Sequence, residues 1–344
     1  MFETHADVPA TRNVTSRSRV RFPAAVLTAL LSATPAFAAD WKLTKGTNDD
    51  LPGQNVTVTR DGQIVARLIY GEGQQIPYLA LYDTEGRLVT NSGLDKAGAT
   101  VGSEPHHRGI FIGWQRVRSD LGVANLWSIG GGAKMTLVDL PELSTTSDSA
   151  TIVARIEWRA PTADASGSNL LITETRRMRI SRSAADDVAT VDATFRLTPA
   201  RDLTLDGDVQ HAGIHLRVSH VVAENPKVTS YLWSPEVPGA SGKVVSPELK
   251  WGEFLFPLHG RWYSATQLNA PKNPVEEFST REYGRFGFFF KKDLKKDEAF
   301  DVTYRFIVRN AETPAENPKR SAAQTAAARA AADAAYTAWV TQQK

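Results

Sequence analysis

The sequence predicts an all-β protein, a large two-sheet antiparallel β-sandwich that ends in an alanine-rich helix. Apolar and polar residues alternate through most of the chain, and turns rich in glycine and aspartate separate the alternating segments. Few segments before Asn310 repeat apolar residues at helical spacing. Alternation with a period of two is typical of half-buried strands, and many such strands joined by turns indicate a sandwich or barrel rather than alternating strands and helices.

The predicted strands begin with 55–70, where NVTVTRDGQIVARLIY alternates on both sides of an Asp-Gly turn typical of a β-hairpin. Segment 77–90 repeats this pattern around a Glu-Gly turn. Further alternating runs, each a predicted strand, cover 150–160, 170–181, 188–199 and 213–222. Segments 286–292 and 300–310 flank the polar sequence DLKKDE, which predicts another hairpin.

Residues 1–38 depart from the strand pattern. They combine arginines, a short apolar run and the small-x-small sequence Ala36, Phe37, Ala38, as a secretory signal peptide does. The apolar run is shorter than the roughly 20 residues of a membrane-spanning helix, and no later segment reaches that length. We therefore expect a bacterial periplasmic or secreted protein without a membrane span after signal cleavage.

The remaining roughly 300 residues suffice for one large domain. We expect a sandwich domain at 39–312 and a helical appendage at 313–344, packed through Tyr336 and Trp339. The chain has no cysteine, so its stability must come from a large core, which 42% hydrophobic residues can supply. The formal net charge is +2 and no basic stripe is visible, which argues against a nucleic-acid partner.

Two of the seven histidines lie in SEPHHRGIFIGW, residues 103–114. GIFIGW reads as a buried strand, and if that strand extends backwards, His106 and His107 point to opposite faces. One interpretation is a histidine that acts as acid, base or metal ligand beside Arg108, which would bind a carboxylate or stabilise an oxyanion. The other is a pair of structural, hydrogen-bonded histidines at a strand entrance.

A second histidine-rich segment, DVQHAGIHLRVSH, favours the functional interpretation. His211, His215 and Arg217 are separated by even intervals, so on a strand they share one face. If this strand neighbours 109–114, imidazoles and guanidiniums converge on an acid–base site for an anionic or sugar substrate, or on a metal site. The spacing gives no closed set of zinc ligands. No cofactor is therefore predicted, and a divalent metal at the histidine cluster is the alternative.

Other candidate residues surround these segments. Trp127 and Trp262 lie near glycines and prolines, where indole rings suit stacking on sugars. Glu174 lies mid-strand beside Arg176, where a buried acid needs a partner. Tyr283 stands between two arginines at alternate positions and can act as a phenolic acid or base, or anchor the sheet edge. The predicted substrate-binding residues are Trp114, Trp127, Glu174, Trp262, Asn273 and Arg281.

The segments EPHHRGIFIGW, NLWS, DVQHAGIHLRVS, NAPKNP and REYGRFG resemble an exported bacterial family labelled PmoA family or methane oxygenase PmoA. The resemblance runs from about Val56 to about Arg309. It implies a sandwich similar to galactose mutarotase, in proteins that accompany carbohydrate breakdown, with sugars held on a concave sheet lined by His, Arg, Tyr and acids. In NAPKNP, Ala270 stands where the family often has histidine, whereas Asn273 and Pro274 remain.

Three functions follow as hypotheses. The first is an enzyme that cleaves glycosidic bonds of an anionic or oxidised sugar by elimination or hydrolysis, with His106 or His211 as base and Tyr283 or the other histidine as acid. The second is a non-catalytic glycan-binding protein. The third is a metal-dependent oxygenase or hydrolase, as the family label implies. The partner expected for the first two is a carbohydrate, and the predicted catalytic residues are His106, His107, Arg108, His211, His215, Arg217 and Tyr283.

Overall fold

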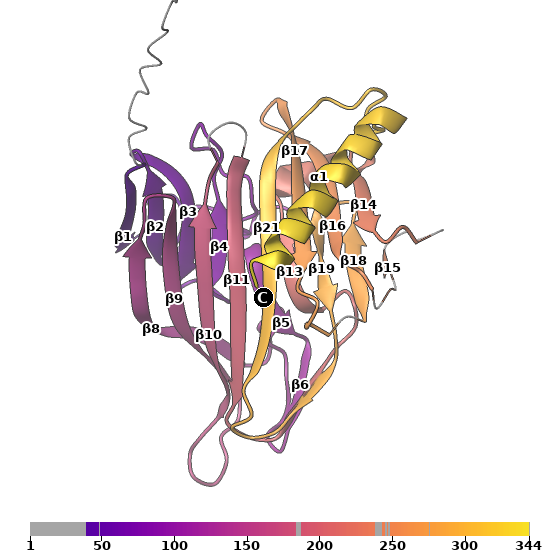
Figure 1. Ribbon diagram of the computed structural model, residues 1–344. Coiled ribbons are helices and arrows are strands. Elements are labelled where there is room, and N and C mark those ends of the chain that lie inside the picture. The colour runs from indigo at the N-terminus through magenta and orange to yellow at the C-terminus, as the bar shows by residue number, and fades with distance from the viewer. Residues whose placement is uncertain are drawn as a thin grey trace, which may run out of the picture. The chain divides into compact units, whose positions relative to one another are not determined.

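A computed structural model describes residues 39–47, 49–183, 187–237, 243–244, 246, 248–274 and 276–343. The predicted signal peptide, at 1–38, lies outside these residues. Antiparallel strands make up most of the described chain, and one α-helix, α1 (Ala322–Thr341), follows them (Figure 1). The predicted all-β sandwich with a C-terminal helix is confirmed. Among the described helices, none has the length and hydropathy of a membrane span.

Three sheets hold the described strands. The nine-stranded sheet has the order β1 (Trp41–Thr47), β2 (Gln54–Arg60), β3 (Gln63–Tyr70), β4 (Tyr78–Leu81), β5 (Gly109–Trp114), β13 (Ala212–Arg217), β19 (Arg285–Phe289), β18 (Glu277–Arg281) and β15 (Lys243–Val244). The eight-stranded sheet has the order β14 (Ser230–Ser234), β16 (Trp251–Leu258), β17 (Arg261–Asn269), β21 (Phe300–Ala311), β11 (Asp187–Pro199), β10 (Leu170–Ser181), β9 (Ser149–Arg159) and β8 (Lys134–Thr145). The four-stranded sheet has the order β20 (Lys292–Leu294), β12 (Leu203–Asp206), β6 (Arg116–Ser119) and β7 (Gly122–Ala124), and it is an addition to the two sheets predicted. Two short 3-10 helices, η1 (His220–Glu224) and η2 (Pro226–Val228), lie between β13 and β14.

Most of the predicted strand pairs form, but one hairpin prediction is wrong. The Asp61–Gly62 turn joins β2 to β3, and both turn residues have positive φ, as a tight hairpin turn requires. Strands β9, β10 and β11 also pair in sequence. By contrast, β19 pairs with β13 and β18, whereas β21 pairs with β11 and β17 in the other large sheet. The segment between them pairs with the small sheet through β20, which carries the chain from one large sheet to the other.

Aromatic side chains join the two large sheets in the core. The rings of Trp114 on β5 and Trp158 on β9 lie 6.2 Å apart, and those of Phe288 on β19 and Tyr304 on β21 lie 5.7 Å apart. All four side chains are fully buried. The indole N–H of Trp114 donates to the carbonyl oxygen of Phe290 at 3.0 Å. Trp114, predicted to bind substrate, is therefore a core residue with a satisfied donor.

A buried ion pair on β10 also faces this core. Arg176 donates from Nε to Glu174 Oε1 at 2.6 Å and from Nη2 to Glu174 Oε2 at 3.2 Å. Trp158 Nε1 donates to Glu174 Oε2 at 2.8 Å, and Arg176 Nη1 donates to the carbonyl of Pro77 at 2.8 Å. Both charged side chains are at most 1% exposed. The predicted substrate-binding residue Glu174 is thus committed to structural contacts inside the sandwich.

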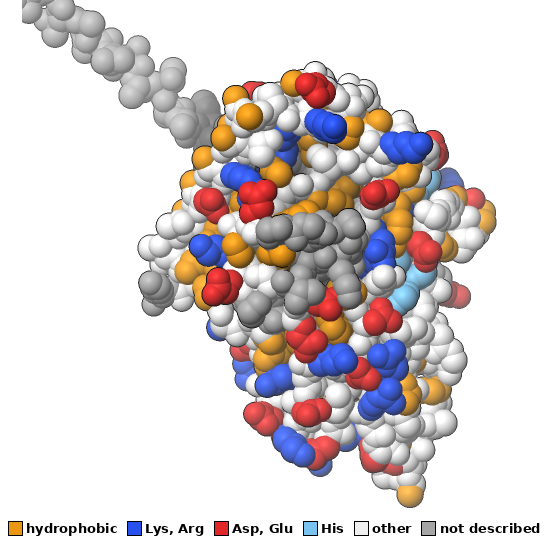
Figure 2. Space-filling model, turned by 90° about the vertical axis from the view of Figure 1, so that its right-hand side faces the viewer, with side chains coloured by type: hydrophobic (Ala, Val, Ile, Leu, Met, Phe, Trp, Pro, Cys, Tyr) orange, Lys and Arg blue, Asp and Glu red, His pale blue; other side chains and the backbone are white. Residues whose placement is uncertain are grey.

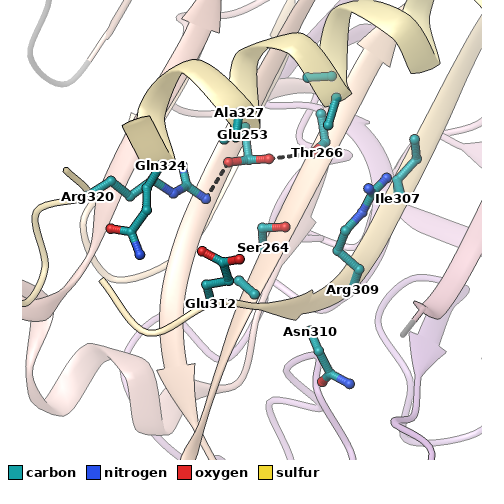
Figure 3. A pocket seen from close by; sticks show the side chains of 14 residues that line it. Glu253, Ser264, Thr266, Ile307, Arg309, Asn310, Glu312, Arg320, Gln324 and Ala327 are labelled. Carbon is teal, nitrogen blue, oxygen red and sulfur yellow. Dashed lines mark hydrogen bonds and ion pairs between the residues drawn. The ribbon is translucent and has the colours of Figure 1, made fainter. Parts of the chain in front are cut away.

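Helix α1 packs on the outer face of β16, β17 and β21. Ser321 and Gln324 form a capping box at its N-terminus, and Trp339, 2% exposed, joins a small core with Trp251. The alanine side chains of the helix leave a cavity of about 290 Å³ above the strands, where Glu253 lies 2.7 Å from Arg320 (Figure 3). None of the predicted site residues lines this cavity.

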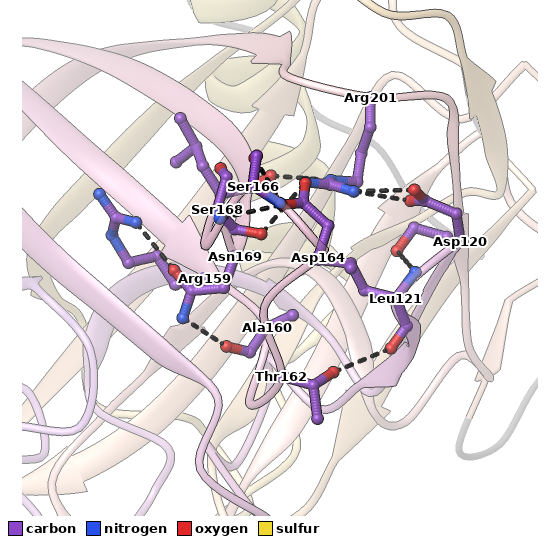
Figure 4. Close-up of polar contacts among 12 residues, drawn as sticks. Asp120, Leu121, Arg159, Ala160, Thr162, Asp164, Ser166, Ser168, Asn169 and Arg201 are labelled. Carbon is purple, nitrogen blue, oxygen red and sulfur yellow. Dashed lines mark hydrogen bonds and ion pairs between the residues drawn. The ribbon is translucent and has the colours of Figure 1, made fainter.

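The polar linker between β9 and β10 is held by an arginine from beyond β11. Arg201 donates to both oxygens of Asp120 at 2.9 Å and to Asp164 at 2.9 Å (Figure 4). Hydrogen bonds from Ser166 and Arg201 hold the pKa of Asp164 well below its usual range. These contacts tie the linker to the β6–β7 turn, so its role in the structure is architectural.

Candidate functional site

The candidate site lies on the face of the nine-stranded sheet that points away from the core. His215 of β13 lies opposite Phe111 of β5 and Gly287 of β19, and Arg217 lies opposite Arg285. Directly opposed residues of antiparallel strands share a face. His215 and Arg217 therefore share one face, as their even spacing predicts. A Cβ at Gly287 would lie 2.7 Å from His215 Cγ, so glycine leaves the space that the imidazole occupies.

A chain of hydrogen bonds runs across this face to Tyr283. His215 Nε2 contacts the carbonyl of Ala212 at 2.8 Å, Arg285 Nη1 donates to His215 Nδ1 at 3.1 Å, and Arg285 Nε donates to Tyr283 Oη at 3.2 Å. A guanidinium can only donate, so His215 is neutral with its proton on Nε2. Both ring nitrogens of the fully buried His215 are occupied. His215 therefore positions Arg285 and Tyr283 and has no lone pair left to act as a base.

His107 is the second buried histidine of the site. Trp127 Nε1 donates to His107 Nε2 at 3.1 Å, and the ring of His107 stacks 6.3 Å from that of Tyr283. An indole N–H can only donate, which places the proton of a neutral His107 on Nδ1. Within the described residues this Nδ1 has no hydrogen-bond partner, although the side chain is only 2% exposed. His107 thus offers a buried N–H donor that lacks an acceptor.

Arg217 offers two more donors of this kind. Its Nη1 donates to the carbonyl of Tyr283, and its guanidinium lies 4.8 Å from the centre of the Tyr283 ring. Its Nε and Nη2 have no partner in the part of the chain that the structure describes. Burial lowers the pKa of Arg217 to about 10, so the group stays charged at neutral pH. A buried, charged and partly unpaired guanidinium is costly unless an acceptor binds it.

The turn before β5 carries the accessible part of the site. His106 and His107 lie in this turn rather than on a strand, because β5 begins only at Gly109. Their rings are therefore neighbours, 4.1 Å apart, instead of pointing to opposite faces. The side chain of His106 is 21% exposed and its Nε2 lies 3.7 Å from Glu104. Histidine side chains reach the surface on the face shown in Figure 2.

Glu104, His106 and His107 each place one possible ligand atom within 4.8 Å of the others. They do not fit a divalent cation, because a ligating imidazole must offer a lone pair. His107 accepts from Trp127 on one nitrogen and carries its proton on the other. Burial, and then the charge of Arg285, lower the pKa of His107 well below its usual range, so nearby positive charge also opposes a cation. The metal-dependent alternative therefore lacks a ligand set at this cluster.

Two further predicted catalytic residues, His211 and Arg108, lie outside the chain of hydrogen bonds that links His215 to Tyr283. His211 precedes β13 and its Nδ1 lies 2.8 Å from Asp208, with the side chain 42% exposed. It is not on the strand that was expected to align it with His215. Arg108 is buried, with Nε donating to the carbonyl of Pro105 and Nη1 to Gln74 Oε1. These bonds hold the turn that carries His106 and His107 in place, so Arg108 stabilises the turn rather than binding a ligand.

Of the remaining predicted binding residues, two lie at the candidate site and two lie elsewhere. Arg281 lines a groove beside Tyr283, and Trp127 lies under Arg285, whose guanidinium is 5.7 Å from its ring. Trp262 lies on β17 in the other large sheet, next to Ala311 of β21. Asn273 is bonded to Thr303 on both its amide nitrogen and its oxygen, which fixes the turn after β17. The residues of the candidate site, called the buried cluster below, are His107, His215, Arg217, Tyr283 and Arg285. Neither Trp262 nor Asn273 contacts the buried cluster in the described structure.

Arg285 is a residue of the candidate site that was not predicted from the sequence. It was noted only as a neighbour of Tyr283, yet it connects His215 to the phenol. The available signal was the period of two in Arg281, Tyr283, Arg285, followed by a buried strand. Arg108 drew attention instead because it stands beside two histidines in the sequence. Only the β13–β19 register shows that Arg285 lies directly opposite Arg217 on the neighbouring strand.

The two buried histidines predict an acid-sensitive fold. Burial, and then the charge of Arg285, lower the pKa of both His107 and His215 well below 6.5, so both are neutral in the folded protein. In the unfolded chain they gain protons below about pH 6.5. The unfolded state then binds more protons, so the free energy of unfolding falls as the pH drops below 6.5, by at most about 1.4 kcal/mol per pH unit for each histidine.

Urea unfolding at pH 7.5, 6.5, 5.5 and 5.0 measures this dependence. His259→Gln, which changes an exposed histidine outside the cluster, should leave the slope unaltered, whereas His107→Gln should reduce it. A free energy of unfolding that stays constant from pH 7.5 to 5.0 would contradict the neutral assignment of both rings.

These features define the protein as an all-β sandwich that carries buried imidazoles and guanidiniums on one face of a sheet. The chain belongs to the family of unknown function DUF6807, whose model matches residues 55–323. That description does not carry the PmoA label, so the resemblance to a PmoA family stays a prediction. No curated protein matches the chain.

Solved structures show distant likeness. A mutant of the heparan sulfate lyase HepC from Pedobacter heparinus aligns with a TM-score of 0.37 and 9% identity, over 81% of this chain and 37% of that one. A variant of a glycoside hydrolase family 97 enzyme from a Pseudoalteromonas species gives 0.39 and 10%, over 72% and 34%. A galactose mutarotase-like protein from Clostridium acetobutylicum gives 0.37 and 8%, over 79% and 99%. The chain thus spans about a third of the first two, and at these scores none of the likenesses bears on its activity.

Proposed function

We propose that this protein is an exported enzyme that cleaves a glycosidic bond of an anionic or oxidised sugar. The observation that carries the proposal is the hydrogen bond from Arg285 Nε to Tyr283 Oη at 3.2 Å. Because the phenol oxygen accepts this bond, its own proton is free to be donated to a leaving oxygen. The charged guanidinium then stabilises the phenolate that remains.

The unpaired donors support an anionic substrate. His107 Nδ1 and Arg217 Nε and Nη2 are buried, lack partners within the described residues, and are all donors. A carboxylate supplies only acceptors and matches such a set. The His106 ring lies 4.1 Å from the His107 ring, and the Arg217 guanidinium lies 4.8 Å from the centre of the Tyr283 ring. The proposal therefore requires one of these two neighbouring rings to move aside when a carboxylate binds the donors.

Elimination is the cleavage that suits these residues. His106, whose pKa burial lowers, is neutral at pH 7 and takes the proton from the carbon next to the bound carboxylate. The electron pair of that C–H bond forms a carbon–carbon double bond as the C–O bond to the leaving sugar breaks. Tyr283 protonates the leaving oxygen. Hydrolysis commonly uses two facing carboxylates, whereas the buried cluster consists of imidazoles, guanidiniums and a phenol.

The test incubates the protein from Ala39 onward with uronate-containing, neutral and 3-keto glycosides, reading the absorbance of unsaturated product and the released reducing ends. We expect unsaturated product from an acidic glycoside. Because burial lowers the pKa of His106, kcat/KM should fall on acidification only below the ordinary pKa range of a free histidine, where His106 takes up a proton. His106→Gln should lower kcat about 100-fold or more, and the matched control His259→Gln should not. Full activity of His106→Gln would exclude it as the base.

Non-catalytic glycan binding is the second candidate, and one observation favours it. His107 and His215 are neutral and already hold their neighbours, so ligand binding alone would not need a proton to move. Thermal stabilisation by an acidic oligosaccharide, equal at pH 7 and pH 8 and without any product, would support this candidate over the enzyme.

A further inference from the structure

A groove of about 780 Å³ opens beside Tyr283, within the size range of ligand sites. Its walls come from η1 and η2, from β14, from the end of β18 with the following turn, and from Ser103 just before the turn that carries His106. Trp233, Arg281 and Tyr283 are among its lining residues. Tyr283 therefore belongs to both the buried cluster and this groove, which we call the Trp233 groove.

The charged group of the groove is available to a ligand. Arg281 makes a single side-chain hydrogen bond, a long one of 3.4 Å to the carbonyl of Thr280, and no carboxylate pairs with it within the described residues. Glu282 also lines the groove and is exposed to solvent. The guanidinium is thus free to bind an anionic group, as Arg does bidentately with carboxylates.

An aromatic ring and hydroxyl groups complete the lining. Trp233 is half-buried, and its indole Nε1 has no acceptor in the described chain. Ser230 and Thr229 line the same groove. Helix α1 supports this wall, since Arg329 Nη1 donates to the carbonyl of Trp233 at 2.8 Å. A ring face, hydroxyls and a free guanidinium match a pyranose that carries an anionic substituent.

We propose that the Trp233 groove is a subsite for an adjoining acidic sugar unit, so that the substrate is an acidic oligosaccharide rather than a single-sugar glycoside. The inference rests on the proposed function, because it places the cleaved bond at Tyr283, between the buried cluster and the groove. One acidic unit occupies the cluster, and its neighbour stacks on Trp233 with its anionic group on Arg281.

The test measures affinity by calorimetry for oligomers of one to four units from polygalacturonate, alginate and hyaluronan, with neutral maltooligosaccharides for comparison. In at least one acidic series we expect affinity to rise at least 10-fold from one unit to two. Trp233→Ala and Arg281→Ala should abolish this rise, and Trp233→Phe should retain part of it. The matched control Arg196→Ala, an exposed arginine on β11 that pairs with Asp301 of β21 and does not line the groove, should keep it in full.

Equal affinity for one and two units in every acidic series, or an undiminished rise in both Trp233→Ala and Arg281→Ala, would overturn the subsite. The same affinities are also measured with Tyr283→Phe. Binding by this variant needs no turnover, so its result tests the groove separately from the enzymatic proposal. A length-dependent rise without product in the wild type supports the groove and contradicts the enzyme. Efficient cleavage of single-sugar glycosides without the rise supports the enzyme and contradicts the groove.

Discussion

Replacing Tyr283 with phenylalanine is expected to lower kcat on an acidic oligosaccharide by about 100- to 10,000-fold, the usual contribution of a positioned general acid. The phenyl ring can still lie over Arg217, so the substitution removes the proton donor and keeps the packing. Arg285 Nε loses one acceptor, which limits the loss of folding free energy to about 1–3 kcal/mol. Steady-state kinetics and urea unfolding of the same preparations separate these two effects.

The matched control for this substitution is Tyr336→Phe, a half-buried tyrosine on α1 that packs against the small core beneath the helix. It also removes a phenolic hydroxyl, but outside the site. We expect its kcat to stay at the wild-type level. A Tyr283→Phe enzyme that keeps more than a tenth of the wild-type kcat would show that Tyr283 is not the acid, and another proton donor would be required.

The strands and the C-terminal helix could be predicted because each depends on local pattern. The Asp61–Gly62 hairpin, the three long strands β9 to β11 and α1 all form where alternation, turn residues and alanine content place them. The wrong hairpin prediction at 286–310 also came from local pattern. Two adjacent strands with a polar turn look like a hairpin, but the intervening segment pairs with β12, which separates them into different sheets.

The candidate site could be predicted only in part, because it depends on register between distant strands. Even spacing placed His215 and Arg217 on one face, since that property belongs to a single strand. The pairing of Arg217 with Arg285 is set by the contact of β13 with β19, which no local pattern encodes. The His107 tautomer depends on Trp127, twenty residues further along the chain and outside the strands. Residue types alone therefore indicated a histidine site without showing which imidazoles were already occupied.

Burial explains why two predicted binding residues belong to the core. Trp114 was predicted as an aromatic binding residue and Glu174 as a mid-strand acid beside Arg176, properties that a substrate site and a core can share. Alternation reports that a residue points to one side of a sheet, but not whether a second sheet covers that side. Here each large sheet covers the other: the eight-stranded sheet covers Trp114 on β5, and the nine-stranded sheet covers Glu174 on β10. Both side chains are fully buried.

Glu174→Ala is expected to lower the free energy of unfolding by about 3–5 kcal/mol, the cost of breaking a buried ion pair from one side. The substitution leaves the guanidinium of Arg176, 1% exposed, with only the Pro77 carbonyl as acceptor, and it leaves the indole N–H of Trp158 unpaired. Urea unfolding at pH 7.5 measures the loss. Replacing both charges by apolar residues, Glu174→Leu with Arg176→Met, should recover most of it, since no charge then remains buried alone.

The same variants distinguish the core assignment of Glu174 from the predicted role in substrate binding. Glu174→Gln keeps the size of the side chain and one acceptor oxygen, so enough folded protein should remain for kinetics. If Glu174 only stabilises the core, the KM for an acidic oligosaccharide stays within about twofold of wild type while the stability falls. A loss of stability below about 1 kcal/mol in Glu174→Ala, together with a KM at least 10-fold higher in Glu174→Gln, would contradict the core assignment and return this carboxylate to the substrate site.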